Sequence, residues 1–196
     1  MKSENNRVKN FWEIGIQYLH ITELVSNETY LQGNQNHFLS EAPITEKELS
    51  EETKWSDFNL VIPLLFNFYH GIEVLLKGFI NLKEGSKTGG HNLSYLLTKF
   101  KKCYPNSSLI PLFEKYITIK KLPDLLAEFC EISSITIDDF YQALKYPESN
   151  QGEKYYHYSL EYKGNKGINF FIELRNDINQ IRKKSVSLAR KEKPNV

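Results

Sequence analysis

Cysteine is scarce in this sequence, which has only Cys103 and Cys130 among its 196 residues. Two thiols at a spacing unlike that of a zinc knuckle predict neither a disulfide framework nor a cysteine-bound metal. The first residues of the chain are polar and lead into an amphipathic stretch, so we do not expect an apolar secretion signal. These absences favour a reducing environment, and we expect a cytoplasmic protein.

A long uninterrupted apolar segment is also lacking. The most apolar stretch, 58–82, contains Pro63 and the polar side chains of Asn67, His70, Glu73 and Lys77. Charged groups at the depth of a bilayer are costly, so this pattern does not favour a membrane-spanning segment. We expect a buried core helix here, and no membrane partner.

An excess of either charge is absent as well, because 25 Lys and Arg stand against 24 Asp and Glu. A nucleic acid or an anionic surface would therefore have to be recognised by a local patch. Hydrophobic residues make up 40% of the chain and charged residues 25%, which is typical of a globular protein. The composition and length predict a single domain over residues 1–196.

Local signatures of common enzyme classes are missing too. The sequence has no GxSxG nucleophile elbow, no GxxxxGKS phosphate loop and no GxGxxG after a predicted strand. No two histidines have the spacing of metal ligands on one helical turn, so we expect neither a metal nor a cofactor. The histidines are His20, His37, His70, His91 and His157.

Apolar residues at three- and four-residue steps, which are typical of amphipathic helices, are plentiful. The steps from Phe11 through Ile14, Tyr18 and Ile21 to Val25 predict a helix over 8–25. The polar segment 27–54 is expected to be a surface excursion, with a short helical turn in 45–52. A helix over 56–83, ended by Gly85, is apolar around nearly its whole circumference and is predicted to be the central helix of a bundle.

The second half of the chain predicts further helices. Asn92 can cap a helix that Pro105 ends, and Ile168, Phe171, Leu174, Ile178 and Ile181 predict inward packing of a last helix that starts near residue 166. Shorter helices are expected within 109–116, 122–130 and 137–144, an extended segment or small hairpin within 154–162, and a polar tail over 191–196. The fold class is therefore all-α, a helical bundle with a long central helix and little strand content.

Polar residues form one stripe on this central helix. Asn67, His70, Glu73 and Lys77 are spaced three or four residues apart on a helix that is otherwise apolar. Each unpaired buried polar group costs about 1–3 kcal/mol, so another helix must supply partners. We expect the last helix to supply them, with Glu73 paired to Arg175.

Such a pairing can be interpreted in two ways. It could form a polar cleft in which Arg175 and Asn176 offer a binding site, since a guanidinium fork suits a phosphate group. It could instead be a structural ion pair beside a solvated face, which is the more usual role of such a pair. The cluster of Arg182, Lys183 and Lys184 leaves the same two alternatives open, a nucleic-acid contact or a solvated helix end.

Three segments resemble the HEPN superfamily of helical proteins. Residues 69–78 read Tyr-His-Gly-Ile-Glu-Val-Leu-Leu-Lys-Gly, which is similar to the family's helix with a Glu-x-x-x-Lys core. Residues 90–97, which follow a glycine loop, resemble the His-Asp/Asn-Leu start of the family's next helix. Leu144-Lys145-Tyr146-Pro147, followed by a polar turn and Gly152, resembles the Arg-Tyr-Pro segment before its last helix.

The resemblance implies an all-α bundle that often dimerises, in prokaryotic antiviral defence or toxin–antitoxin systems, where active members cleave RNA without a metal. Their motif is an arginine, a polar residue and then a histidine, with four to six residues between the arginine and the histidine. Arg175 and Asn176 match the first two positions, but Gln180, Ile181 and Arg182 stand where the histidine is expected. Neither glutamine nor a protonated arginine can take a proton from a ribose hydroxyl.

Three hypotheses about function follow. The first is a noncatalytic HEPN-like module that binds RNA, a nucleotide or a protein partner, with a homodimer expected. Its binding residues would be Asn67, Glu73, Lys77, Arg175, Asn176 and Arg182. The second is a metal-independent endoribonuclease in which Arg175 acts with a stand-in histidine, namely His70, His91 or His157. The third is a helical scaffolding protein.

Overall fold

The computed structural model describes residues 2–37 and 43–192, with side chains from residue 10 onward. The described part is all-α and has no β-strand, only an isolated bridge between Glu148 and Lys154. This confirms the predicted fold class. The α-helices are α1 (Lys2–Leu31), α2 (Glu46–Thr53), α3 (Asp57–Glu84), α4 (Leu93–Cys103), α5 (Ile110–Ile117), α6 (Asp124–Ser133), α7 (Phe140–Ala143) and α8 (Asn165–Glu192). The 3₁₀ helices are η1 (Ile119–Lys121), η2 (Ile137–Asp139) and η3 (His157–Leu160).

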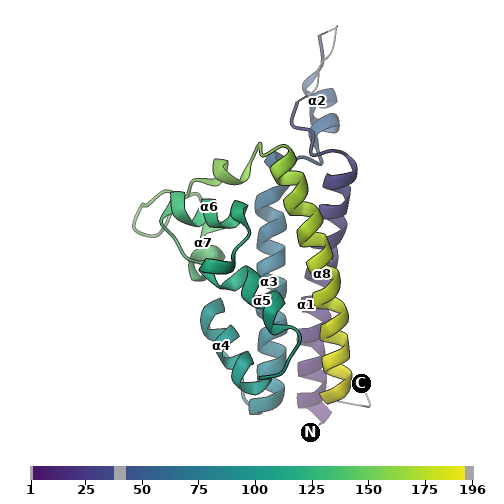
Figure 1. Cartoon of the computed structure of the whole chain (residues 1–196), viewed down its shortest axis with the longest axis vertical. Helices are drawn as coiled ribbons and strands as arrows, with labels where there is room; N and C mark the ends of the chain where they lie inside the picture. Colours follow the sequence, from purple (N-terminus) through teal and green to yellow (C-terminus); the bar gives the residue numbers. More distant parts are fainter. Residues whose placement is uncertain (1, 38–42, 193–196) are drawn as a thin grey trace.

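The three long helices α1, α3 and α8 run side by side, and the short helices α4 to α7 gather on one flank of α3 (Figure 1). Helix α3 contacts α1, α4 and α7, and it buries side chains around most of its circumference, which confirms the prediction of a central helix. By length and composition alone α3 could cross a membrane, but most of its apolar window is buried inside the fold. A core helix of a soluble protein has this character.

The first helix is longer than predicted and buries a different face. Although Ile14 and Ile21 belong to its heptad-like apolar series, they are 45% and 46% exposed. The buried side of α1 carries the small residues Gly15, Thr22 and Ser26 beside Leu19. A Cβ atom on Gly15 would lie 2.8 Å from the Cγ atom of Leu75 on α3, so the two helices approach too closely for larger side chains between them. Hydrophobicity alone does not predict which face of α1 is buried, because the close approach of the two helices requires small side chains at the contact, whether or not they are apolar.

The predicted surface excursion 27–54 is shorter in the structure. Helix α1 extends to Leu31, and the predicted turn in 45–52 is a full helix, α2, begun by a capping box between Thr45 and Glu48. A buried hydrogen-bond group lies below it. Asn34 bonds to the backbone and carboxylate of Asp57 at 2.6 and 2.9 Å, and Asp57 also accepts the backbone N–H groups of Tyr162 and Lys163. The end of α1 and the start of α3 are thereby joined to the segment before α8.

The other helix predictions agree well with the structure at the ends that the sequence marks clearly. Asn92 caps α4 by accepting the N–H of Tyr95 at 2.6 Å, and Gly85 ends α3 at a φ of 65°. On α8, the side chains of Phe171, Leu174, Ile178 and Ile181 are buried as predicted, and that of Ile168 is partly buried. Segment 154–162 forms η3 instead of a hairpin, and α8 continues to Glu192, so only 193–196 of the predicted tail lies outside the described residues.

Candidate functional site

The predicted pair between Glu73 and Arg175 is wrong. Glu73 accepts a hydrogen bond from Lys77 at 2.7 Å, and its Oε1 atom lies 3.0 Å from Nδ1 of His91. Arg175 instead donates from Nη1 to the side-chain oxygen of Asn27 at 2.8 Å. The physical reason is the order of the helices: α8 packs mainly against α1, so its polar side faces α1 and not the stripe on α3.

Glu73 and its partners form an anchor for the loop before α4. The Glu73 side chain is 6% exposed and that of Lys77 is 12%, and the ring of His91 stacks on Tyr141 with 4.2 Å between centroids. A few residues on, Asn81 accepts the backbone N–H of Thr88 in the same loop at 2.7 Å. The cavity beside Glu73 holds about 10 Å³, room for no more than a water molecule. The geometry therefore favours the structural interpretation of the α3 stripe.

The two remaining residues of this stripe are not part of the anchor. His70 lies between Tyr18 of α1, at 4.6 Å between ring centroids, and Phe66, at 5.9 Å. Its Nδ1 atom is buried and has no partner among the described residues, and burial lowers the pKa of His70. Asn67 is half-buried beside it on α3. The stripe therefore does not form one continuous polar cleft.

A second polar group joins α8 to α1, and several predicted site residues lie there. Besides its bond to Asn27, Arg175 donates from Nη2 to Asn176 at 3.3 Å, and its guanidinium carbon lies 5.4 Å from the ring centre of Tyr30. One turn on, Glu23 of α1 accepts hydrogen bonds from Asn179, at 2.9 Å, and from Arg182. The structure therefore brings Arg175, Asn176 and Arg182 of α8 together, but places them against α1 and away from Asn67, Glu73 and Lys77.

Beside these contacts an open groove follows α8. It holds about 420 Å³ and is lined by Ile16, Asn179, Arg182, Lys183, Val186 and Arg190; we call it the α1–α8 groove. Arg175 and Arg182 are seven residues apart on α8, and so are Lys183 and Arg190, so each pair shares one side of the helix. The two pairs lie next to each other and together form one basic row along α8. The row spans 15 residues, or about 22 Å. Among the described residues only Arg182 of this row forms an ion pair, with Glu23, so the groove is cationic.

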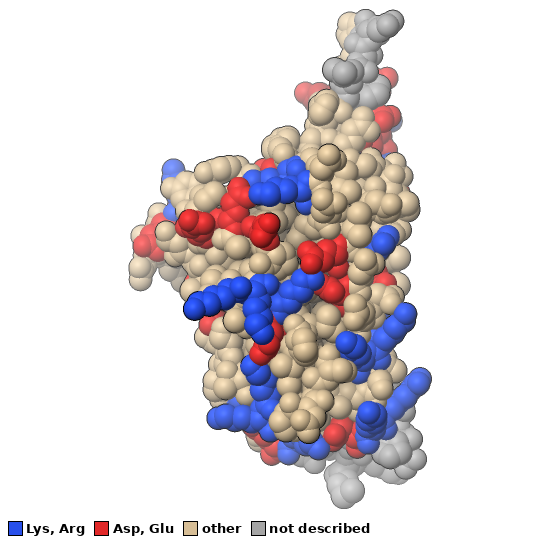
Figure 2. Space-filling model, viewed as in Figure 1, with Lys and Arg blue, Asp and Glu red and all other residues tan. Residues whose placement is uncertain are grey.

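The surface charge agrees with this local excess. Figure 2 shows basic side chains gathered over the lower half of the molecule, around α4, α5 and the C-terminal half of α8. Acidic side chains are more frequent higher up, around α6. The two signs are nevertheless interleaved around α5, because Lys101 and Lys121 form ion pairs with Glu114, and Lys115 forms ion pairs with Glu173 and Asp177.

None of the three candidate histidines lies near Arg175 in the folded chain. His91 belongs to the Glu73 anchor, and the Nε2 atom of His157 lies 2.6 Å from the carbonyl oxygen of Ala143. His70 contacts Tyr18, which is nine residues from Asn27, the partner of Arg175. Nine residues at about 100° each place these two positions on opposite sides of α1. A stand-in role for His70, His91 or His157 beside Arg175 is therefore not supported within one chain.

A histidine outside the predicted set lies closer. The Nδ1 atom of His20 is 3.9 Å from the Glu23 carboxylate that binds Arg182, and its side chain is 51% exposed. A signal for it exists in the sequence, because His20, Glu23 and Asn27 are polar residues at three- and four-residue steps on α1. Its meaning becomes clear only once α8 is known to pack on α1 instead of on the central helix.

Metal ligands and relatives give no further assignment. Within the part of the chain that the structure describes, no three His, Cys, Asp or Glu residues come together as a possible metal site. No family model, curated protein or solved structure matches the chain. The likeness to HEPN proteins therefore stays a resemblance between short segments, and the function has to be argued from the site.

Proposed function

We propose that the chain is a noncatalytic, cytoplasmic RNA-binding module, and that the α1–α8 groove holds the sugar-phosphate backbone. The observation that carries the proposal is the row of Arg175, Arg182, Lys183 and Arg190 along one side of α8. Phosphate contacts from such cations supply much of the affinity for nucleic acids. A row of about 22 Å suits several successive phosphates of an extended strand.

Groups for stacking lie beside the row, which favours RNA over a simple anion. Tyr30 is 39% exposed next to Arg175, and the His20 side chain is half exposed next to Glu23. Single-stranded RNA presents unstacked bases that bind flat aromatic and guanidinium groups. The resemblance to HEPN proteins, many of which act on RNA in defence systems, supports the same substrate class.

We propose a noncatalytic module because the motif histidine is missing and other residues stand at the positions where it is expected. Arg182, one of the residues at that position, is held by Glu23, and Gln180 is exposed. An amide cannot act as a general base near neutral pH. The groove therefore offers binding groups without the proton acceptor of the family mechanism.

The first prediction tests binding by fluorescence anisotropy with a labelled single-stranded RNA. The double variant Lys183→Ala/Arg190→Ala should bind at least tenfold more weakly, and the slope of log affinity against log salt should fall by about 0.7 for each phosphate that the variant no longer neutralises. The matched control is Lys102→Ala/Lys120→Ala, which removes two exposed lysines outside the groove. Equal weakening in both variants, or binding that does not depend on salt, would contradict the proposal and favour a scaffolding role.

A second candidate function rests on His20. Its place beside Glu23 and Arg182 would suit a metal-independent endoribonuclease in which His20 replaces the motif histidine. RNA incubated with the protein in EDTA separates the two functions. The noncatalytic proposal expects intact RNA, whereas cleavage that His20→Asn abolishes would establish the nuclease.

We also propose that the protein partner is a second copy of this chain, packed on the outward side of α1. Ile14 and Ile21 are nearly half exposed there, and Leu24 is 52% exposed. Ile14 and Ile21 belong with Phe11, Tyr18 and Val25 to an alternation of three- and four-residue steps, the repeat by which two helices pair, and Leu24 lies beside it. The face is distinct from the α1–α8 groove, so a dimer would leave both grooves open.

A further inference from the structure

The Arg175 end of the basic row carries side-chain amides as well as charge. Arg175 donates from Nη1 to Asn27 of α1 at 2.8 Å and from Nη2 to the neighbouring Asn176 at 3.3 Å. Its guanidinium carbon lies 5.4 Å from the ring centre of Tyr30, which is three residues from Asn27 and so on the same side of α1. Two amides, a guanidinium group and an aromatic ring therefore meet at one point of the contact between α1 and α8.

The chemistry of arginine decides how the two amides are turned. A guanidinium group has only donors, so Asn27 and Asn176 direct their oxygen atoms to Arg175. Their NH₂ groups point away from it, and neither forms a hydrogen bond with another described residue. Asn176 is exposed and Tyr30 is 39% exposed, so a ligand can reach this place from solvent. The end of the row thus presents hydrogen-bond donors beside an accessible ring.

Donors beside a flat ring suit one base better than the others. Guanine presents two adjacent acceptors, O6 and N7, and a bidentate contact from a basic side chain to them is the commonest specific base contact. Adenine has an amino donor where guanine has O6, and uracil has an N–H donor between its two carbonyl oxygens. Cytosine has an amino donor next to its N3 acceptor, and its smaller ring stacks over less area. Guanine is therefore the base whose edge matches the donors at Arg175.

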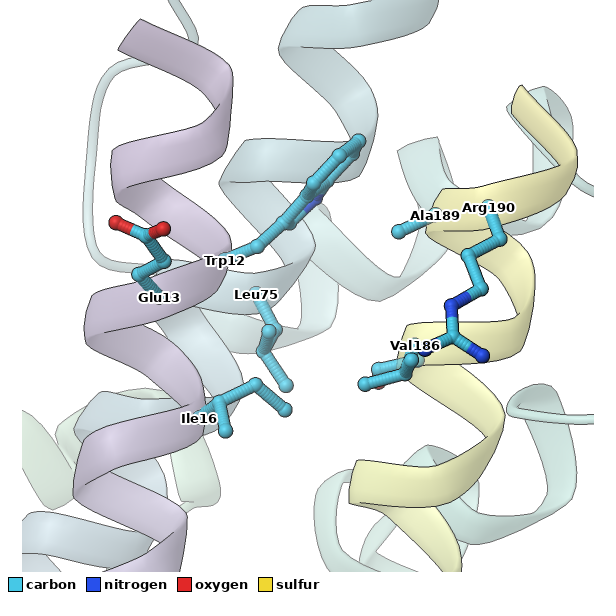
Figure 3. Close-up of a pocket in the computed structure, with 8 residues that line it drawn as sticks. Trp12, Glu13, Ile16, Leu75, Val186, Ala189 and Arg190 are labelled. Atoms are coloured by element: carbon cyan, nitrogen blue, oxygen red, sulfur yellow. The ribbon is translucent and has the colours of Figure 1, made fainter. Parts of the chain in front are cut away.

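The opposite end of the row offers charge without such a set of donors. There Arg190 lies beside a mostly apolar hollow between α1 and α8, with Trp12 and Ile16 on one wall and Val186 on the other (Figure 3). The residues that line this hollow include no side-chain amide, and the hydroxyl of Ser185 among them is buried. Arg190 can attract a phosphate, so the groups that could recognise a base belong to the Arg175 end.

We infer that the four side chains at this end form a guanine-binding subsite of the α1–α8 groove. The base stacks on Tyr30, and its O6 and N7 atoms accept from the outward N–H groups of Asn27, Asn176 and Arg175. The other cations of the row hold the phosphates of the neighbouring nucleotides. The inference rests on the proposed RNA binding and adds a base preference to it.

The test is fluorescence anisotropy with labelled oligouridylates that differ at one central nucleotide. The guanosine RNA should bind about tenfold more tightly than the adenosine RNA, which is the discrimination typical of a bidentate base contact. Inosine keeps O6 and N7 and should match guanosine, whereas 7-deazaguanosine lacks N7 and should bind more weakly.

The results separate this inference from the proposed function. Salt-dependent binding with equal affinity for the guanosine and adenosine RNAs would overturn the subsite and leave RNA binding in place. A cytidine RNA bound as tightly as the guanosine RNA, or an inosine RNA bound as weakly as the adenosine RNA, would also overturn the subsite. If none of these RNAs binds, both the subsite and the proposed function fail.

Two pairs of variants locate the preference. Asn176→Asp replaces the outward NH₂ group by an oxygen that repels O6 and N7, so the preference for guanosine over adenosine should disappear. Gln180→Glu adds the same charge at an exposed position one turn further along α8, so it should weaken both RNAs equally and keep the preference. A preference that survives Asn176→Asp, or one that Gln180→Glu also removes, would show that the base is recognised elsewhere.

The second pair concerns stacking. Tyr30→Ala should weaken binding of the guanosine RNA about tenfold, because it removes the ring on which the base stacks. Tyr30→Phe keeps the ring and should bind like the wild type. Equal affinity of Tyr30→Ala and Tyr30→Phe for this RNA would refute stacking at this place.

Discussion

The two thiols of the chain lie in different surroundings, and this predicts different reactivity. Cys130 is 3% exposed, and burial raises its pKa to about 12. Cys103 is partly exposed at the end of α4, and burial raises its pKa by less. Because the thiolate is the reactive form, a disulfide reagent near pH 8 should modify Cys103 slowly and Cys130 only on unfolding. Cys103→Ser should remove the first phase of this reaction; a native protein that still reacts at once would contradict the burial of Cys130.

Acid should destabilise the fold through His70. Because burial lowers the pKa of His70 from its usual value of 6.5, the unfolded chain takes up a proton at a pH where the folded chain does not. The contribution of this group to stability is complete above 6.5 and is lost as the pH falls from there toward the lower folded pKa. Urea unfolding at about pH 7.5 and about pH 5.5 should show a larger loss of free energy for the wild type than for His70→Gln. An identical loss in the two proteins would rule out the mechanism.

Individual side chains of the site were only partly predictable. Arg175, Asn176 and Arg182 could be named because their types and order resemble a known motif. Their partners, Asn27 and Glu23, could not, because they lie about 150 residues away and the sequence does not say which helix covers which. Orphaned atoms such as Nε1 of Trp12 depend on the packing of several helices and leave no trace in the sequence.

At the scale of elements, the anchor between α3 and the loop before α4 gives a stability prediction. Glu73→Ala leaves the ammonium group of Lys77 buried without its carboxylate, and breaking such a pair costs about 3 kcal/mol. The double variant Glu73→Leu/Lys77→Leu removes both charges and should cost clearly less, because no buried charge is left unpaired. Denaturant unfolding of the three proteins measures the difference. A double variant as unstable as Glu73→Ala would show that packing, and not charge, dominates at this place.

Helix ends were more predictable than helix faces. Asn92 and Gly85 act locally, as a cap and as a left-handed terminator, so their effect is visible in the sequence. The face of α8 was also predictable, since large apolar residues fill it. The buried face of α1 was not, because Gly15, Thr22 and Ser26 are small or polar and hide a contact that depends on close approach to α3.

At the scale of the whole molecule, the class of the fold and its central helix were predictable from the sequence, but the neighbours of that helix were not. The polar stripe on α3 was expected to contact the arginine on α8. Instead, α8 packs on α1, where Arg175 bonds to Asn27, and His91 in the loop before α4 contacts Glu73 on α3. Both arrangements give partners to Glu73, Lys77 and Arg175. Long-range packing decides between the two arrangements, and the residue pattern of a single helix does not predict that packing.

The outward side of α1 gives the last prediction. A series of apolar residues with helical spacing normally packs on something, and in the described fold Ile14 and Ile21 pack on nothing that covers them. If a second copy covers them, light scattering should give twice the chain mass of 23.0 kDa for the wild type. Ile14→Asp/Ile21→Asp should give the single mass with unchanged helix content, because the two side chains are already half in water.

The control for this prediction is Ile119→Asp, which places the same charge at an apolar residue that is 48% exposed on η1, away from α1. It should remain a dimer, because an added charge weakens association only where it would be buried between the two copies. A wild type that is monomeric at every concentration, or an Ile14→Asp/Ile21→Asp variant that stays dimeric, would mean that this face of α1 does not join two chains. The apolar repeat would then be a surface feature of the bundle, and RNA binding would take place on a monomer with one groove.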